Sequence, residues 1–282
     1  MNEQLHALEP REYTLSEARI FLSKVYIWMA LTLLLTGGVA WYATQTPELL
    51  MWTVQNIWIP IIATLGIVLV MNFMAHRLTV NALIILLVTF AALEGLLFGP
   101  ILLAYTQESL ALTFTCTAGM FGAMGLFGAF TKINLSGMGR TLMMILIGLI
   151  ISMVANWFWG NGTFDLICSG VGVILFAAFT AYDTQYLLAI GMCEDEDIRR
   201  KGAVLGTMSL YLDFINLFLF LLRFLGNREC AQPRLAPWPP PPHGYQTPHH
   251  PRHAGALLAA EPARLCVQLH RGTDGRGHRH HD

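Results

Sequence analysis

The chain has 282 residues and a formal net charge of −1, so no basic excess points to a nucleic-acid partner. Hydrophobic residues make up 55% of it and charged residues 12%, about half the charged share of a soluble domain. With a mean hydropathy of +0.52, this composition indicates a membrane protein. The five cysteines form no CxxC pair and no Cys/His metal-ligand spacing, so they are expected to fill apolar space. No nucleotide-binding loop, nucleophile elbow or metalloprotease motif appears, and we expect no cofactor.

The first 24 residues mix seven charged side chains with isolated apolar ones. A cleavable signal peptide would instead place an apolar run directly after a short basic start. The segment from Thr14 to Glu17 fits a capping box, in which a hydroxyl and a carboxylate cap the first turn of a helix. Residues 1–24 are therefore predicted to form a cytoplasmic amphipathic segment that leads into the first span.

Seven apolar segments follow, each close to the roughly 20 residues that a helix needs to cross about 30 Å of hydrocarbon. We therefore expect an all-α membrane protein whose membrane domain, residues 25–228, is a seven-transmembrane-helix bundle. The predicted spans lie near residues 25–44, 57–74, 80–104, 110–130, 141–159, 165–189 and 204–225.

The basic residues of the loops predict the orientation. Loops 45–56, 105–109 and 160–164 contain no lysine or arginine. Since cytoplasmic loops are enriched in basic residues, the N-terminus is expected in the cytoplasm. The other set of loops and the N-terminal segment hold nine basic residues: Arg11, Arg19, Lys24, Arg77, Lys132, Arg140, Arg199, Arg200 and Lys201.

Residues 229–282 have a different composition. From residue 231 onward they hold nine of the 13 prolines and eight of the 10 histidines, which leaves little from which to build a core. We predict a disordered Pro/His/Arg-rich tail, foreign to the membrane domain, and an artefactual out-of-frame extension is an alternative origin. The histidines at its end are not expected to form a dedicated metal site.

Two aspartates inside the last two spans are the most informative residues, because an ionised side chain at the bilayer centre costs at least about 2.5–3.5 kcal/mol to insert. Asp183 and Asp213 are both expected about 10–12 Å deep from the cytoplasmic ends of their spans, so they can meet. At about 4 Å and an effective dielectric of about 20, they would repel by about 4 kcal/mol. The pair is therefore predicted to share one proton and act as a pH switch. The alternative is that the two side chains only lock their spans together by hydrogen bonds.

Other polar residues accompany this pair. Arg77, at the cytoplasmic junction of spans two and three, can reach inward to a carboxylate or snorkel to the headgroups. Glu94 lies deep in span three and could extend a polar path from the aspartates. Each aspartate also has polar neighbours on its own helix face: Thr180 and Thr184 for Asp183, and Ser209 and Asn216 for Asp213.

Span four carries Gly119, Gly122, Gly125 and Gly128 at regular spacing. Small residues let helix backbones approach closely, so we expect a helix-packing surface there.

Three stretches resemble the Bax inhibitor family, in particular its bacterial inner-membrane branch. They are Ala118–Met124 (AGMFGAM), Thr180–Gln185 (TAYDTQ) and Leu210–Phe218 (LYLDFINLF), and the resemblance covers about residues 15–228. It implies a bundle with the seventh helix central and a location in the bacterial inner membrane.

The same resemblance implies a pH-sensitive calcium leak. It implies that Asp183 and Asp213 are the pH-sensing pair in the ion pathway and that Arg77 acts as a latch, while Glu94 occupies a position also found in the family. Hard divalent cations prefer carboxylate oxygens, so the two aspartates are predicted to contact calcium transiently.

Two other functions remain open. The glycine-rich face of span four could bind membrane-protein partners such as a membrane protease, in which case the protein is a regulator. A more remote alternative is an intramembrane aspartyl protease, because Tyr182-Asp183 and Asp213 place two aspartates on consecutive spans. The Gly-x-Gly-Asp and Pro-Ala-Leu elements of those enzymes are absent, so enzymatic activity is not expected.

Overall fold

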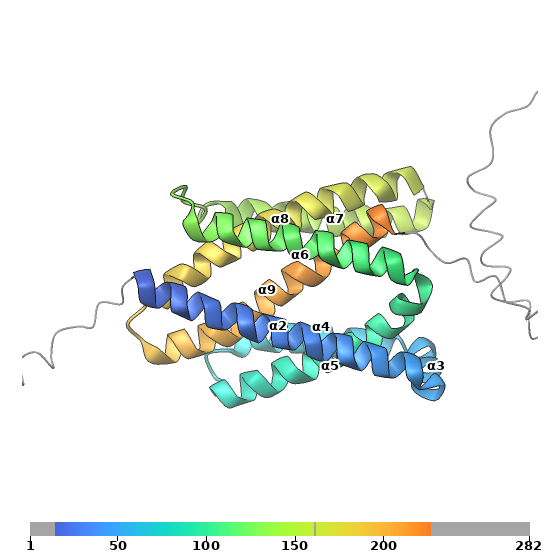
Figure 1. The fold of residues 1–282 in the computed structure, drawn as a ribbon, viewed down its shortest axis with the longest axis horizontal. Helices are drawn as coiled ribbons and strands as arrows, with labels where there is room; N and C mark the ends of the chain where they lie inside the picture. The colour runs from blue at the N-terminus through green and yellow to red at the C-terminus, as the bar shows by residue number, and fades with distance from the viewer. Residues whose placement is uncertain (1–14, 161, 227–282) are drawn as a thin grey trace, which may run out of the picture. The chain divides into compact units, whose positions relative to one another are not determined.

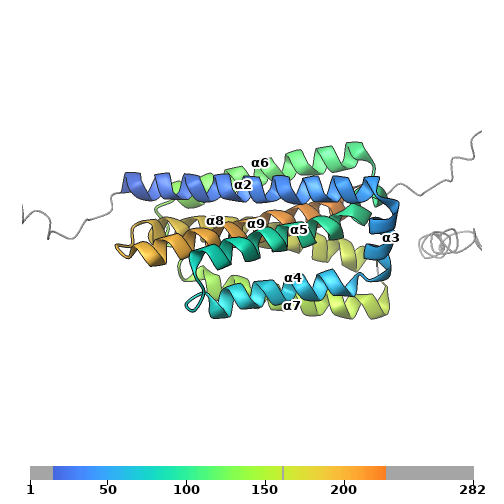
Figure 2. The ribbon, with the colours of Figure 1, turned by 90° about the horizontal axis from the view of Figure 1, so that it is seen from below.

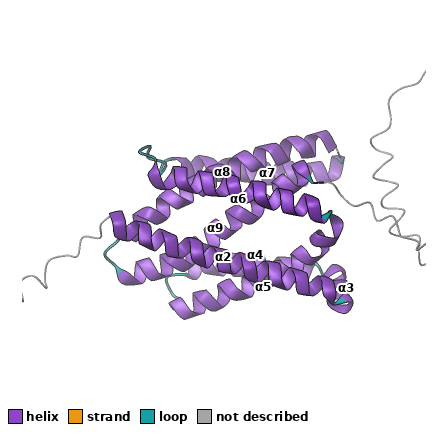
Figure 3. Cartoon of the chain, in the orientation of Figure 1, coloured by secondary structure: helices purple, strands orange, loops and turns teal. Residues whose placement is uncertain are grey.

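The computed structural model describes residues 15–160 and 162–226, and within these ranges the regular structure is helical only (Figure 3). The predicted tail, residues 229–282, and most of the predicted N-terminal segment lie outside the described residues. The helices are α2 (Leu15–Gln45), α3 (Pro47–Gln55), α4 (Trp58–Met74), α5 (Val80–Ala104), α6 (Gln107–Phe130), α7 (Met138–Trp159), α8 (Gly162–Gly191) and α9 (Glu196–Leu225).

Six of these helices are long and apolar enough to cross a membrane. A seventh crossing is obtained if α3 and α4, which are bent by 75° at their junction, form one broken span. Helix α4 alone is short for a crossing, because its 17 residues extend only about 25 Å. The sequence prediction of an all-α membrane protein is therefore confirmed, with six or seven crossings.

Local sequence signals fix several helix ends. The side chains of Thr79 and Thr106 accept hydrogen bonds from backbone N–H groups in the first turns of α5 and α6, and Asp195 does the same for α9. Gly160 ends α7 in the left-handed conformation, with φ 64°, which glycine adopts without steric cost. By contrast, α2 runs unbroken from Leu15, so its first ten residues are not separated from the predicted first span.

The bundle has three layers. Figures 1 and 2 together show α2 and α6 on one face, α4 and α7 on the opposite face, and α5, α8 and α9 between them. Loops 75–79, 131–137 and 192–195 lie at the same end as the start of α2 (left in Figure 1). We call this the basic end, because these loops and the helix turns beside them carry basic residues: Arg77, Lys132, Arg140, Arg199, Arg200 and Lys201.

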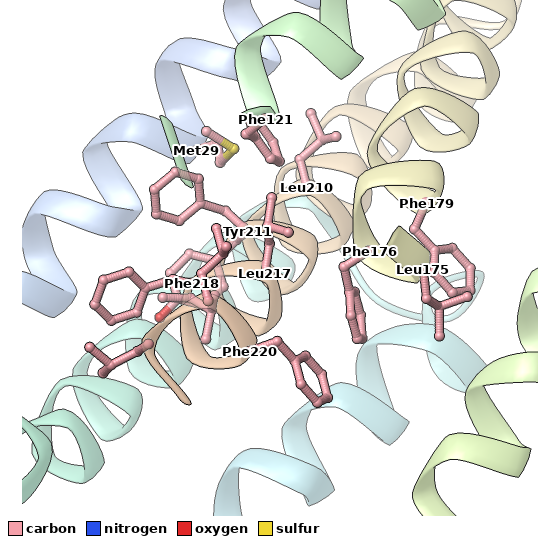
Figure 4. Close-up of a cluster of buried hydrophobic side chains, with 14 of the residues drawn as sticks. Met29, Phe121, Leu175, Phe176, Phe179, Leu210, Tyr211, Leu217, Phe218 and Phe220 are labelled. Carbon is pink, nitrogen blue, oxygen red and sulfur yellow. The ribbon is translucent and has the colours of Figure 1, made fainter. Parts of the chain in front are cut away.

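Helix α9 is the most buried of the candidate spans. Its most apolar stretch is 72% buried, compared with 11% for α7, and it packs against α2, α5, α6 and α8. Figure 4 shows its Leu210, Tyr211 and Leu217 among aromatic side chains from neighbouring helices. Burial of this apolar surface holds the bundle together by dispersion contacts, since lipid removes most of the hydrophobic driving force between helices.

The outer helices expose large apolar side chains. Ile147, Ile151 and Val154 on α7 are more than half exposed, an arrangement that favours contact with lipid chains over contact with water. At the end of α7, Trp157, Phe158 and Trp159 are each about four-fifths exposed. Tryptophan is enriched at the headgroup layer, so Trp157 and Trp159 place this end of α7 at the membrane interface.

Only part of the predicted glycine surface on α6 is used for packing. A side chain at Gly125 would meet the hydroxyl of Tyr26 on α2, and one at Gly128 would meet the backbone of Ala181 on α8. A Cβ atom added at Gly119 or Gly122 would have no atom of another helix within 4 Å. The glycine surface of α6 therefore packs against α2 and α8 only at Gly125 and Gly128.

Replacing Gly128 by alanine is expected to lower the free energy of unfolding by about 1–3 kcal/mol, because the added methyl group presses against rigid backbone. The measurement is reversible unfolding in detergent followed by circular dichroism. Gly122→Ala on the same helix is the matched control and should leave stability unchanged or slightly raised. Equal losses in the two variants would contradict this packing.

Candidate functional site

A cavity of about 670 Å³ lies among α4, α7, α8 and α9. Its walls are mostly apolar, with aromatic and methionine side chains prominent. The polar residues that line it are Asp183, Ser209, Asp213 and Asn216, and none of the lining residues is lysine, arginine or histidine. The structure therefore brings both predicted aspartates to one cavity, without a basic side chain among its walls.

Asp213 is the most deeply placed of these acids. Its side chain is buried, with 5% of its surface exposed, and its Oδ2 atom has no hydrogen-bond partner among the described residues. Buried polar atoms are nearly always paired, and leaving a charged one unpaired is costly. The carboxyl group of Asp213 therefore combines one enclosed, unpaired oxygen with a place in the cavity wall.

Asp183 and Asp213 were expected at the same depth in the bundle, but Asp183 faces α9 about one turn away from Asp213. Gly202 and Gly206 of α9 pack against Ile190 and Leu187 of α8, and this antiparallel register aligns Asp183 with Ser209. Ser209 interacts with the Asp183 carboxyl group, and Asp183 acts electrostatically on Asp213. Because Ser209 and Asp213 are four residues apart, the carboxylates are offset by about one helical turn, or about 6 Å along α9.

The sequence prediction missed this offset because it counted depth from an expected start of span seven near residue 204, whereas α9 begins at Glu196. Among the described residues, no group of three or more His, Cys, Asp or Glu side chains is placed to hold a metal ion. The acidic part of the site is thus a pair of carboxylates. The side-chain amide of Asn216 donates a hydrogen bond to the Leu212 carbonyl of its own helix.

The predicted supporting threonines face elsewhere. Thr180 and Thr184 are fully buried and are not among the residues that line the cavity. Each hydroxyl bonds to its own helix, Thr180 Oγ1 to the Phe176 carbonyl at 2.8 Å and Thr184 Oγ1 to the Thr180 carbonyl at 2.7 Å.

Tyr26 of α2 makes a polar contact between helices that the sequence did not suggest. Its hydroxyl lies 2.7 Å from Thr184 Oγ1. Since Thr184 donates its single proton to the Thr180 carbonyl, Tyr26 is the donor in this bond. The tyrosine also lies close enough to interact electrostatically with Asp213 and Asp183. It ties α2 to α8 beside the aspartates.

The structure does not bring the predicted latch to the pair. Arg77 is exposed in the turn after α4, and its Nε atom donates a hydrogen bond to His76 Nε2 at 3.2 Å. Within the described ranges, no ion pair joins it to Asp183 or Asp213. Its role as a latch stays a prediction.

Glu94 belongs to a second polar cluster. It is half-buried in α5 and interacts electrostatically with Tyr211 of α9. The Tyr211 hydroxyl lies 2.9 Å from Thr36 Oγ1 of α2, which also lies 3.0 Å from the Ala91 carbonyl. This cluster joins α2, α5 and α9, and neither Glu94 nor Tyr211 lines the aspartate cavity.

A smaller cavity of about 340 Å³ lies between the loop before α7 and the last turns of α8, at the basic end. Gln185 holds this loop, donating to the Ile133 carbonyl at 2.8 Å and accepting from the Leu135 N–H at 2.7 Å. Tyr182 lines both this cavity and the aspartate cavity, and its ring packs against Gly139 of α7. Its side chain is therefore part of the wall between the two.

These features define an α-helical integral membrane protein with a pair of acidic side chains in a cavity of its helix bundle. A family model described as "Inhibitor of apoptosis-promoting Bax1" matches residues 18–230. The chain belongs to this Bax inhibitor-like family, which confirms the resemblance found in the sequence.

Curated relatives match along most of their length. The chain is 43% identical to "Inner membrane protein YbhL" of Escherichia coli strain K12 over 217 residues, covering 74% of this chain and 92% of the relative. It is 40% identical to a protein of Deinococcus radiodurans described as uncharacterized, over 78% of this chain and 95% of the relative. A third similar protein, RP147 of Rickettsia prowazekii, is 37% identical and is also described as uncharacterized.

Removal of the hydroxyl from Tyr26 is expected to reveal its coupling to Thr184. In a double-mutant cycle, Tyr26→Phe and Thr184→Val should show a coupling energy of about 0.6 kcal/mol, and at most about 1.7 kcal/mol, as for other hydrogen bonds between membrane helices. The measurement is reversible unfolding of the four proteins in detergent.

Thr180→Val provides the control cycle with Tyr26→Phe, because the Thr180 hydroxyl bonds only within α8. Its coupling energy should be near zero. Equal coupling in both cycles would mean that Tyr26 does not bond to Thr184.

Proposed function

We propose that this protein is a pH-sensitive leak pathway for cations, with calcium as the ion that it carries. The observation that supports this most directly is Asp213: a nearly buried carboxylate with an unpaired oxygen, facing a large cavity and electrostatically coupled to Asp183. Intramembrane acids are costly to bury and commonly mark ion or proton pathways.

Proton sharing provides the gate in this proposal. With one proton on the pair, Asp183 and Asp213 carry a single negative charge, and α8 and α9 stay packed together. Loss of that proton leaves two charges that repel each other across the helix interface and attract a cation. The other titratable groups near the pair are Tyr26 on α2 and Tyr182 on α8. Flux is therefore expected to rise as pH rises.

Calcium suits the proposed pathway because hard divalent cations prefer oxygen ligands. The pair offers carboxylate oxygens, and Ser209 and Asn216 line the same cavity with neutral oxygens. Passage requires only brief contact, since an ion that binds too tightly does not leave. The proposal is transport, with no catalysed reaction and no resident cofactor.

The proposed topology counts α3 and α4 as one broken span, so that α9 is the seventh span and lies at the centre of the bundle. The high burial of α9 and its packing on four other helices support this. The basic end is assigned to the cytoplasm by the positive-inside rule, and a bacterial inner membrane is supported by the similarity to the Escherichia coli protein.

Arg77 and Glu94 enter the proposal through their positions. Arg77 lies in a turn at the basic end, from which a long side chain can move toward the cavity and hold α4 against the aspartates in a closed state. Glu94, beside Tyr211 on another side of α9, would receive the ion after the aspartates.

A second candidate function is regulation of membrane-protein partners. Gly119 and Gly122 are exposed on α6 with open space beside them. Small residues of this kind allow another transmembrane helix to approach closely, which supports a partner on this face. Crosslinking from α6 in native membranes, with and without Gly122→Leu, would test it.

Asp213→Asn should abolish the pH dependence of calcium flux, because an amide can neither lose a proton nor share one. The measurement is calcium entry into proteoliposomes over a range of pH. Asp165→Asn is the matched control: Asp165 lies at the far end of α8, 3.7 Å from Arg223, so its variant should keep the dependence. An unchanged pH profile for Asp213→Asn would refute the gate.

Tyr182→Ala should raise the flux at every pH while leaving the shape of the pH profile unchanged, because it removes a wall between the two cavities and neither carboxylate. Tyr186→Ala is the control: its ring stacks on Tyr182 but lines only the smaller cavity. The same liposome assay applies. An equal rise in calcium flux for both variants would show that Tyr182 does not separate the two cavities.

A further inference from the structure

The aspartate cavity has features that ion passage alone does not require. Its volume of about 670 Å³ lies within the range of about 300–1,000 Å³ typical of small-molecule sites. A bare cation needs far less space. Most of the lining is apolar, so the cavity combines a large hydrophobic volume with a small acidic region.

The cavity is accessible from the lipid side of the bundle. Helix α4 packs against α5, and α7 packs against α8, but among the described residues α4 and α7 have little contact with each other. Leu65 of α4 and both Met143 and Ile150 of α7 line the cavity, and at least half of the surface of each is exposed. Both helices lie on the same face of the bundle (Figures 1 and 2). A hydrophobic molecule can therefore enter sideways from the bilayer.

The acidic region selects the charge of such a molecule. Asp213 presents a buried oxygen with no partner, Asp183 adds a second carboxyl group, and no basic residue lines the cavity. A neutral lipid chain would fill the apolar volume but leave Asp213 unpaired, and an anionic head would be repelled. A positively charged nitrogen would be paired. The rings of Phe176, Phe179 and Tyr182, also in the lining, can add cation–π attraction.

We propose that this cavity binds single-chain lipophilic amines. The ammonium group pairs with the Asp213 carboxyl group at the cavity wall, and the hydrocarbon chain extends between α4 and α7 toward the lipid. Such amines are protonated at neutral pH, as lysine is. The charge-assisted hydrogen bond supplies selectivity, and the flexible methionines of α7 adapt to the chain. The binding follows from the geometry of the cavity and does not depend on calcium passage.

The test is photoaffinity labelling of the full chain in phosphatidylcholine nanodiscs, with dodecylamine that carries a diazirine in its chain. We expect saturable labelling of α4 and α7 peptides that is competed by unlabelled dodecylamine and not by dodecanol. Asp213→Asn should weaken the saturable binding about tenfold or more. Asp165→Asn, outside the cavity, should bind as the unmodified protein does.

A second variant tests the cavity without touching the carboxylates. Met153→Trp adds volume to the α7 wall and should also reduce the saturable labelling, so the inference remains testable if Asp213→Asn fails to fold. Competition by dodecanol as strong as by dodecylamine would overturn the proposal, since the site would then be a purely apolar gap. Labelling that never saturates above the lipid background would overturn it as well. Because no flux is measured, these results are independent of the proposed leak.

Discussion

Moving a carboxylate out of water costs several kcal/mol even after the protein relaxes around it, and α9 carries Asp213 in its most buried stretch. The bundle compensates only in part. Ser209 interacts with Asp183, but one oxygen of Asp213 stays unpaired. In the proposed leak, this incomplete compensation leaves the carboxylate responsive to protons and cations. The proposed leak and the proposed amine site both depend on it.

Most of the fold could be predicted from the sequence, because the length and apolar composition of each segment identify the spanning helices. Apolar stretches of spanning length mark every long helix in the sequence, and capping residues such as Thr79, Thr106 and Asp195 mark several starts. The start of α4 agrees with the predicted span 57–74, but residues 45–56 were predicted to be a loop, so the helix α3 and its 75° junction with α4 were missed. Similarly, the continuity of α2 from Leu15 could not be distinguished from a separate amphipathic segment.

The site was predictable in its acids and not in its geometry. Asp183 and Asp213 stand out because acids are rare in apolar spans, but their offset of one turn is set by how Gly202 and Gly206 seat against α8. Thr184 has the right spacing to accompany Asp183, yet it bonds to Tyr26 from a helix far away in sequence. Such contacts depend on tertiary packing, which single-chain patterns do not contain. A tyrosine hydroxyl inside span one was the only available signal for Tyr26.

The sparse contact between α4 and α7 has a consequence for where the boundary of the site lies. Because α4 packs mainly on α5 and α7 mainly on α8, we expect the space between α4 and α7 to be closed by the molecules that surround the protein. In a membrane, annular lipids would then form part of the cavity wall. We therefore expect the dimensions of the cavity to vary with acyl-chain order and lateral pressure, so that membranes of different composition offer the same polypeptide sites of different size.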